Sequence, residues 1–351
     1  MSKKNIPTLH DVAKAAAVSP GTVSRALTRP DLVAEKTRER ILKHVKKLHY
    51  LADPAGRNLR ANKPIVVGAV IPKNGISTFA QTISDLSDAL ESKKITLIVS
   101  QPEYSSASSD SAAYRLLEQG ADALILLGED HDQGLFDTLN HRAIPHLLLW
   151  TTTDPKGKHY VTVNQSKAGM IAARHLLDLG HQSFAYIGVP LLHNARAAAR
   201  LSGVKKELKS AGIAIAPSAI IEEDHRFGSG RAAVEAVLKK HPETTAIICT
   251  SDYHALGVLR GIYEIGKRVP ADISVVSFNN NDFSAFTIPS ITTVDLKQRD
   301  VGIYAADSIY QLLNNEPMKS INIQPELRIR ESSGRASQPD PKRRFKKEAQ
   351  N

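Results

Sequence analysis

The chain has 351 residues, 42% of them hydrophobic, with 46 Lys and Arg against 36 Asp and Glu. This size predicts two or three domains, and no apolar run reaches the ~18 residues of a membrane span, which excludes a membrane partner. The single cysteine, Cys249, and the lack of an opening signal-peptide pattern predict a cytoplasmic protein without disulfides.

The positive charge is concentrated at the two ends of the chain. Residues 1–63 hold 14 Lys and Arg against 5 Asp and Glu, and residues 335–351 hold 6 against 2, which leaves −3 for the part between them. This pattern indicates that the amino-terminal part binds a polyanion. We expect a basic arm over residues 1–7 and a basic, disordered tail over 335–351, which has no leucine heptads.

Residues 8–28 have the pattern of two short helices joined by a tight turn. Thr8 can cap the first helix, and Asp11 can complete a capping box with it. Ser19 followed by Pro20 can begin the second helix. Apart from one arginine, the outward positions of the second helix are small: Gly21, Thr22, Ser24 and Arg25. These features describe a helix-turn-helix, a motif that places its second helix in the DNA major groove.

A third helix is expected over Glu35–Tyr50, after a turn at Asp31–Val33. Its predicted apolar side contains Ile41, Leu42, Val45 and Leu48. Ala34 lacks a capping side chain, which weakens the start of this helix by ~1 kcal/mol. Residues 1–52 therefore form a predicted helical headpiece.

A linker over residues 53–63 follows the headpiece. Asp53 can cap a short helix that begins with Pro54. So short a helix is marginal in isolation, and Gly56 inside it costs a further ~1 kcal/mol. Taken alone, this segment is therefore expected to be only marginally stable as a helix.

From residue 64 onward, short apolar runs alternate with amphipathic stretches. This alternation predicts an α/β body of parallel sheets flanked by helices. Ten strands are too many for one comfortable sheet, so we expect two lobes. The strand candidates are Ile65–Ile71, Ile95–Ser100, Ala123–Leu127, His146–Trp150, Tyr160–Val163, Phe184–Gly188, Ala219–Glu222, Ala246–Thr250, Ile273–Phe278 and Ile291–Val294.

The motif D-V-A-x-x-A-x-V-S-x-x-T-V-S-R-A-L over Asp11–Leu27 resembles the headpiece of the lactose/galactose repressor family. The body motifs His175–Gly188, Arg200–Gly203, Ser251–Gly257, Pro270–Val276, Ile288–Val294 and Leu327–Ser333 extend this resemblance over roughly residues 8–334. The resemblance implies a periplasmic-binding-protein-like effector and dimerisation domain over 64–334. Its first lobe would hold about 64–163 and 294–324, and its second about 164–293 and 325–334.

The resemblance implies that ten residues approach double-stranded DNA: Thr8, Ser19, Pro20, Gly21, Thr22, Ser24, Arg25, Arg57, Leu59 and Arg60. Arg25 could hold a guanine edge or a phosphate, and the sequence leaves both open. Pro20 and Gly21 stand where relatives carry longer base-reading side chains, so we expect direct readout to be sparse. Leu59 matches a leucine that wedges into the minor groove, with a contact between paired linkers as the alternative.

For the effector, Arg200 and Asp252 match the family's ligand-binding arginine and aspartate, with a surface charge and a helix cap as the alternatives. Phe79 matches a cleft-lining aromatic residue, and a core position is an equal alternative. Trp150 stands where sugar-binding relatives often place an aspartate, and its ring could stack on a sugar or a base.

Further departures from the family concern the charge of the cleft. His225, with Phe227 nearby, stands at a position where a stacking aromatic residue is common. Asn279 and Asn280 replace two aspartates of the family pattern. With Arg196 near Arg200, this loss of carboxylates favours an anionic effector such as a sugar acid or sugar phosphate.

We therefore predict a homodimeric repressor of a sugar or sugar-acid operon that binds a pseudo-palindromic operator and responds to a small effector. The sequence contains no nucleophile-elbow motif and no metal-ligand spacing, so we predict neither an enzyme nor a cofactor. The alternatives are a solute-binding protein, a purine- or nucleoside-responsive regulator, an enzyme on the same body and an architectural DNA binder without sequence preference.

Overall fold

The computed structural model describes residues 7–48, 50, 64–73, 76–103, 105–192, 194–224 and 228–336. Residues 1–6 of the predicted basic arm (1–7), the whole predicted linker (53–63) and residues 337–351 of the predicted tail (335–351) lie outside these residues. The same holds for five predicted site residues: Arg57, Leu59, Arg60, His225 and Phe227.

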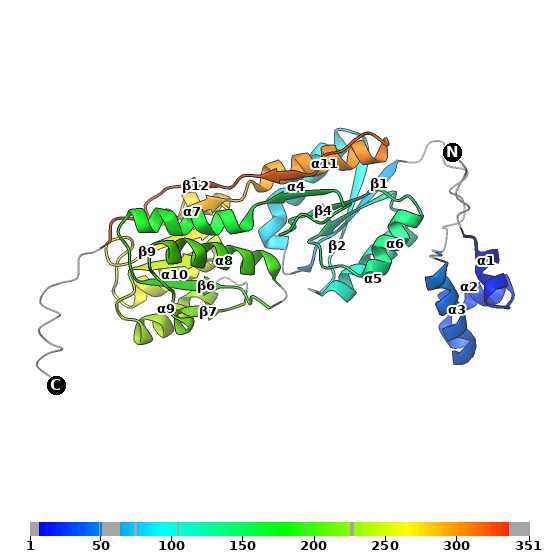
Figure 1. Ribbon diagram of the computed structural model, residues 1–351, viewed down its shortest axis with the longest axis horizontal. Helices are drawn as coiled ribbons and strands as arrows, with labels where there is room; N and C mark the ends of the chain where they lie inside the picture. The colour runs from blue at the N-terminus through cyan, green and yellow to red at the C-terminus, as the bar shows by residue number, and fades with distance from the viewer. Residues whose placement is uncertain are drawn as a thin grey trace, which may run out of the picture. The chain divides into compact units, whose positions relative to one another are not determined.

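The headpiece is a three-helix unit with its own small core (Figure 1). Its helices are α1 (Leu9–Ala15), α2 (Pro20–Thr28) and α3 (Glu35–Lys47), with a 3₁₀ turn, η1 (Pro30–Leu32), before α3. Val12, Val23 and Ile41 are fully buried where the three helices meet. Ala17, with φ of +49°, makes the turn between α1 and α2. The predicted helix-turn-helix is confirmed.

Two details of the predicted headpiece were wrong. The third helix ends at Lys47, three residues before the predicted end. Leu42 is 41% exposed, because it lies about 100° around the helix from the buried Ile41. Ala34 precedes α3 and makes no side-chain capping bond. The weaker start of this helix stays a prediction.

The first of two six-stranded sheets, together with its helices, is called the N-lobe here. Its strand order is β11-β5-β4-β3-β1-β2, and β1 pairs in parallel with both β2 and β3. The strands are β1 (Ile65–Val70), β2 (Ile95–Ser100), β3 (Ala123–Leu127), β4 (His146–Leu149), β5 (Tyr160–Val163) and β11 (Ile321–Ile323). The helices are α4 (Ile76–Glu91), α5 (Ser106–Glu118), α6 (Gln133–His141) and α11 (Gln298–Leu313).

The second sheet and its helices form the C-lobe. Its order is β12-β10-β9-β8-β6-β7, and β12 runs antiparallel to β10. The strands are β6 (Phe184–Gly188), β7 (Ile220–Glu222), β8 (Ala246–Cys249), β9 (Ser274–Phe278), β10 (Thr292–Asp295) and β12 (Glu326–Arg328). The helices are α7 (Gln165–Asp178), α8 (Ala195–Ser210), α9 (Ser229–Lys240) and α10 (Asp252–Glu264), with the 3₁₀ turns η4 (Pro217–Ala219) and η5 (Asp282–Ala285).

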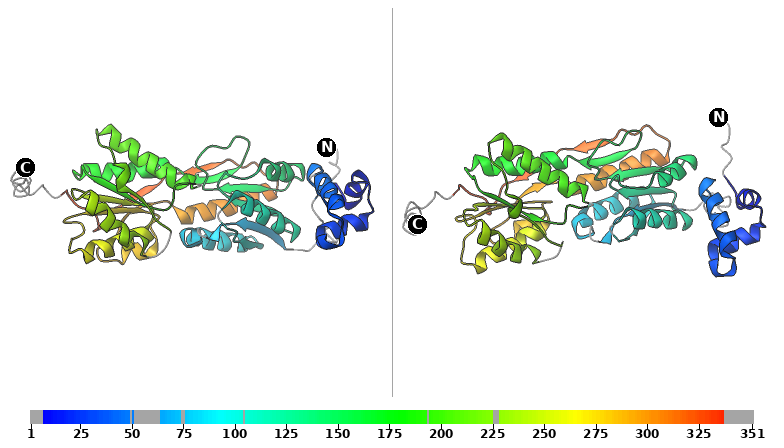
Figure 2. Two further views of the ribbon diagram at one scale, coloured as in Figure 1. Left: turned by 90° about the horizontal axis from the view of Figure 1, so that it is seen from below. Right: turned by 60° about the horizontal axis from the view of Figure 1, so that its bottom comes forward.

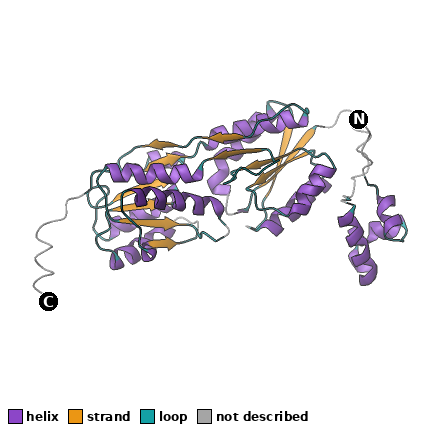
Figure 3. Ribbon diagram, in the orientation of Figure 1, coloured by secondary structure: helices purple, strands orange, loops and turns teal. Residues whose placement is uncertain are grey.

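Helices cover both faces of the C-lobe sheet (Figures 2 and 3). Helix α7 packs against α8 at very short range, because glycines meet backbone there. A Cβ built on Gly169 would lie 2.0 Å from the carbonyl oxygen of Arg200, and one on Gly203 would lie 1.9 Å from that of Ser166. The close contact fixes α8, which carries Arg196 and Arg200, against the rest of the lobe.

All ten predicted strands are present, each within one residue of its predicted bounds. Strands β11 and β12 were not predicted, because three-residue strands with partly exposed positions give no detectable apolar run. The chain changes sheet after β5, after β10 and after β11. The chain forms two compact units. The first ends at Leu149 and also includes residues 155–160 and 302–320. The second consists of residues 150–154, 161–301 and those from 321 onward.

The folded C-lobe extends two residues into the predicted tail. The amide of Ala336 donates a hydrogen bond of 2.9 Å to the carbonyl oxygen of Leu179. Over the stretches that the structure covers, no helix combines the length and the apolar character needed to cross a bilayer.

Candidate DNA-contacting helix and effector-binding residues

The start of α2 is held by side-chain hydroxyls. The Ser19 hydroxyl accepts a hydrogen bond of 3.1 Å from the amide of Thr22, and the two hydroxyl oxygens lie 2.8 Å apart. At the start of α1, the Asp11 carboxylate accepts bonds from the Thr8 amide and hydroxyl, at 2.8 and 2.7 Å. These bonds lower the pKa of Asp11. Both predicted caps are therefore formed.

One face of α2 is buried and the other is exposed. Val23 and Ala26 pack in the headpiece core, whereas Gly21, Ser24 and Arg25 are exposed. A Cβ on Gly21 would have a single neighbour within 4 Å, the Ser19 hydroxyl at 3.9 Å. Packing thus does not require a glycine there. Gly21 leaves the backbone of α2 accessible to a partner. This is consistent with the prediction that few side chains of this helix read DNA bases.

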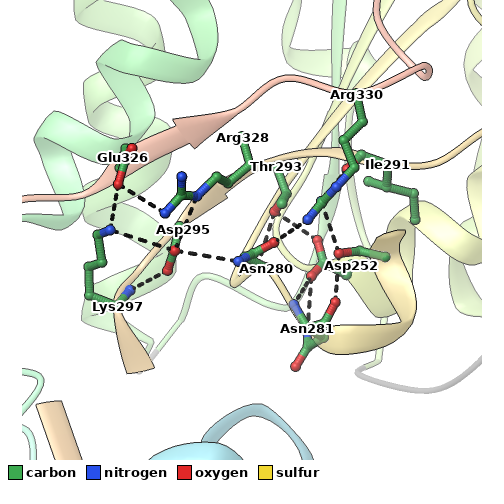
Figure 4. A network of polar contacts seen from close by, with 11 residues as sticks. Asp252, Asn280, Asn281, Ile291, Thr293, Asp295, Lys297, Glu326, Arg328 and Arg330 are labelled. Atoms are coloured by element: carbon green, nitrogen blue, oxygen red, sulfur yellow. Dashed lines mark hydrogen bonds and ion pairs between the residues drawn. The ribbon is translucent and has the colours of Figure 1, made fainter. Parts of the chain in front are cut away.

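In the C-lobe, Asp252 is the centre of a buried cluster (Figure 4). One carboxylate oxygen accepts hydrogen bonds from the Ser277 hydroxyl and, at 2.9 Å, from the Thr293 hydroxyl. The other accepts from the amide and side chain of Asn281, at 2.6 and 3.2 Å. Burial raises the pKa of Asp252 to about 6, against the opposing effect of these bonds. The cap of α10 is Ser251, so the helix-cap alternative for Asp252 is wrong.

Asn280 lies beside this cluster, bonded on both sides of its carboxamide. Its oxygen accepts a 2.6 Å bond from the guanidinium of Arg330, and its nitrogen donates to Asp295 at 3.4 Å. Arg330 also donates to the carbonyl oxygen of Ile291 and the hydroxyl of Ser284, at 2.7 and 3.1 Å. The segment after β12 thus holds the loop after β9 in place.

Arg200 is buried on α8. Its guanidinium donates to the side-chain oxygen of Gln165 at 2.5 Å and lies 5.4 Å from the ring centroid of Phe278. The phenol of Tyr186 is beside it, and burial raises the pKa of that phenol to about 12. These contacts exclude the surface-charge alternative for Arg200.

The other predicted effector residues lie on different elements. Asn279 is buried directly after β9 with φ of +107°. Its backbone amide donates a hydrogen bond to the carbonyl oxygen of Val294. Trp150 is 2% exposed, with φ of +58°, directly after β4. Phe79 is buried on α4, and Arg196 is partly exposed in the first turn of α8. Their roles as effector contacts stay predictions. In the parts of the chain described, no cluster of His, Cys, Asp or Glu could hold a metal ion.

Sequence comparison identifies both parts of the chain. Residues 8–53 match the model of the "Bacterial regulatory proteins, lacI family", and residues 173–333 match the "Periplasmic binding protein-like domain". The chain is 27% identical over 322 residues to catabolite control protein A of Priestia megaterium, covering 92% of this chain and 97% of that protein. It is 28% identical over 329 residues to the HTH-type transcriptional repressor PurR of Klebsiella pneumoniae, covering 93% and 96%.

The chain belongs to the LacI family. The structure of the lac repressor dimer bound to operator and the anti-inducer ONPF superimposes with a TM-score of 0.71 at 27% identity, covering 94% of this chain and all of that one. The transcriptional regulator CelR in complex with cellobiose has a TM-score of 0.68 at 25% identity, covering 93% of this chain and all of that one. This LacI-family protein is a ligand-responsive, DNA-binding regulator of transcription, and the family is not one of enzymes.

The structure of this LacI-family protein reveals partners that the sequence analysis did not select. They are Gln165 for Arg200, Ser277, Asn281 and Thr293 for Asp252, and Arg330 for Asn280. Thr293 and Arg330 fall inside motifs already compared with the family, and Ser277 directly follows one. A search for polar residues at strand ends, in and directly after those motifs, would have found them.

Proposed function

We propose that the chain is a homodimeric repressor that binds a pseudo-palindromic operator, with α2 of each subunit in a major groove. The observation that carries this proposal is the face of α2, where a capped start and an exposed Gly21, Ser24 and Arg25 stand on a buried helix-turn-helix core. A twofold symmetric protein fits a twofold symmetric site. A related structure, the lac repressor dimer, is bound to operator.

The proposed dimer is supported by an apolar patch on the C-lobe. Phe286, Ile288 and Ile329 are exposed by 84%, 97% and 65%. The segments that carry Ile288 and Ile329 lie together, because the amide of Ser290 donates to Glu331 at 2.8 Å. An exposed apolar patch of this kind is typical of a protein interface.

For the effector, we propose a sugar, a sugar acid or a sugar phosphate. Arg196 and Arg200 on α8 supply positive charge. Asn279 and Asn280 supply amides where carboxylates would repel an anion, and the Asp252 carboxylate is already saturated by four donors. A purine is a second candidate, since PurR repressors are among the relatives at 28% identity.

The operator proposal is tested by selection from a random duplex library with the full-length protein. We expect enrichment of one sequence with twofold symmetric half-sites. Enrichment of an asymmetric site, or of none, would contradict the proposal.

The effector proposal is tested by thermal unfolding with matched compounds: glucose, gluconate, glucose 6-phosphate, ribose 5-phosphate and hypoxanthine. A ligand of the proposed class should raise the unfolding temperature and change operator affinity, and Arg200→Ala should abolish both effects. A response to hypoxanthine alone would establish the purine alternative.

The dimer proposal is tested by Ile288→Lys, with Leu192→Lys as the control, because Leu192 is an apolar residue exposed by 77% on another loop. Sedimentation should show a dimer for the control and a shift to monomer for Ile288→Lys. A dimer in both variants would exclude this patch as the interface.

A further inference from the structure

The three segments that connect the two sheets are joined by side chains. Lys167, after the first crossing, donates to Gln324 in the third at 2.7 Å. Lys297, in the second crossing, donates to Glu326 at 2.5 Å. The third segment therefore contacts both of the others. We call residues 164–167, 295–298 and 323–328 the crossover bundle.

Four charged residues close a ring within this bundle (Figure 4). Lys297 contacts Asp295 at 3.8 Å and Glu326 at 2.5 Å. Arg328 contacts Glu326 at 3.1 Å and Asp295 at 3.6 Å. A single exposed ion pair stabilises little, but a network in which every charge has two partners holds its members in one arrangement.

Asn280 links this ring to the buried Asp252 cluster. The Thr293 hydroxyl donates to Asp252 at 2.9 Å and accepts from the backbone amide of Asn280 at 3.3 Å. The carboxamide of Asn280 then donates to Asp295, a member of the ring, at 3.4 Å. The path from Asp252 to the crossover bundle is thus continuous through hydrogen bonds.

The geometry of Asn280 suits a connecting role. Its φ is +57°, a left-handed conformation that asparagine and glycine tolerate better than other residues. Arg330 fixes the carboxamide oxygen, so the nitrogen points toward Asp295. Because the Thr293 proton is committed to Asp252, a disturbance of that carboxylate reorients the hydroxyl that Asn280 depends on.

We propose that Asn280 is a positioning residue that couples the Asp252 cluster to the crossover bundle, so that events at Asp252 reach the segments joining the two sheets. This inference rests on the proposed function in one respect, namely that the effector binds beside the Asp252 cluster, at Asn279 and Asn280. Coupling of this kind is carried by packed, hydrogen-bonded elements with two arrangements.

The first test is amide hydrogen exchange of the full-length protein, measured by mass spectrometry over residues 295–298 and 321–328. Asn280→Asp keeps the backbone conformation and the bond from Arg330, but it places a second carboxylate beside Asp295. We expect exchange in both segments to rise by about two- to thirtyfold. The matched control is Asn315→Asp, because Asn315 is exposed after α11 with the same φ of +57°.

The second test separates coupling from a merely structural role. Asp252→Asn is introduced into the natural sequence and into Asn280→Gly, and exchange over 321–328 is compared. We expect Asp252→Asn to raise exchange at least twofold in the natural sequence and to have no further effect beside Asn280→Gly. Independent effects that multiply, or equal exchange in Asn280→Asp and its control, would overturn the proposal. The effector site is tested by the separate thermal-unfolding series, so failure of one proposal does not decide the other.

Discussion

The headpiece and the C-lobe differ in how far the polar side chains proposed to be functionally important are exposed. On α2, Ser24 and Arg25 are exposed beside a short apolar core. In the C-lobe, Asp252 is fully buried and its oxygens are saturated by four hydrogen bonds. A surface proposed to meet DNA keeps its polar side chains accessible, whereas a cluster proposed to transmit a signal is held in place by buried hydrogen bonds. The comparison predicts that changes in the two regions will have separable effects.

The largest effect is expected from Asp252→Ala. This change leaves the donors of Ser277, Asn281 and Thr293 buried without an acceptor, so the C-lobe should lose about 3–5 kcal/mol of unfolding free energy. Chemical denaturation measures the loss. Hydrogen exchange in the headpiece should stay unchanged. An equal rise in exchange in both regions would contradict the separation of the two regions.

Ile41→Ala should destabilise the headpiece by about 2–4 kcal/mol, because it opens a cavity in a core of few residues. So small a unit has a low free energy of unfolding, so the variant headpiece should unfold and operator binding should be lost. Leu42→Ala, one position along and exposed, is the control. Calorimetry should show an unaltered C-lobe transition in both variants.

Arg25→Ala should weaken operator binding by about 1–3 kcal/mol, the range of one good arginine contact to a base. Its exposed side chain supports no core, so stability and effector response should be retained. Anisotropy titrations against Arg29→Ala, an exposed arginine just after α2, provide the comparison. Loss of effector response in Arg25→Ala would show that the two regions are not separable.

A smaller effect concerns pH. The pKa of Asp252 is raised from 3.8 to about 6 in the folded protein. The folded state therefore holds this proton more tightly than the unfolded state does, and the free energy of unfolding should fall as pH rises from about 4 to about 6. Above pH 6 the contribution should be constant. Denaturation at a series of pH values should show this fall in the natural sequence and a weaker one in Asp252→Asn.

The smallest effect is expected at the start of α3. Ala34 has an extended backbone, with φ of −53° and ψ of 135°, and no capping side chain. Ala34→Ser should add a cap and stabilise the headpiece by about 0.5–1 kcal/mol. Thermal unfolding of the headpiece signal measures the gain, and no change would show that the N-terminal amides of α3 are already satisfied.

The same contrast explains what the sequence could predict. Caps, periodicity and a tight turn are local, so Thr8, Ser19 and the buried Val23 could be placed from the order of residues alone. The partners of Asp252 and Asn280 are distant in sequence: Arg330 is 50 positions from Asn280. Such contacts depend on strand order, which no local pattern encodes. The three-residue strands β11 and β12 could not be predicted, because they contain no apolar run.

The central claim is that this chain recognises a particular DNA sequence through α2. The most direct test is an anisotropy competition at physiological salt between the selected duplex and a scrambled duplex of equal length. The account predicts a preference of at least ~10³ for the selected duplex, which Arg25→Ala should reduce. Equal affinity for the two duplexes, with and without the tested sugars and purine, would contradict it.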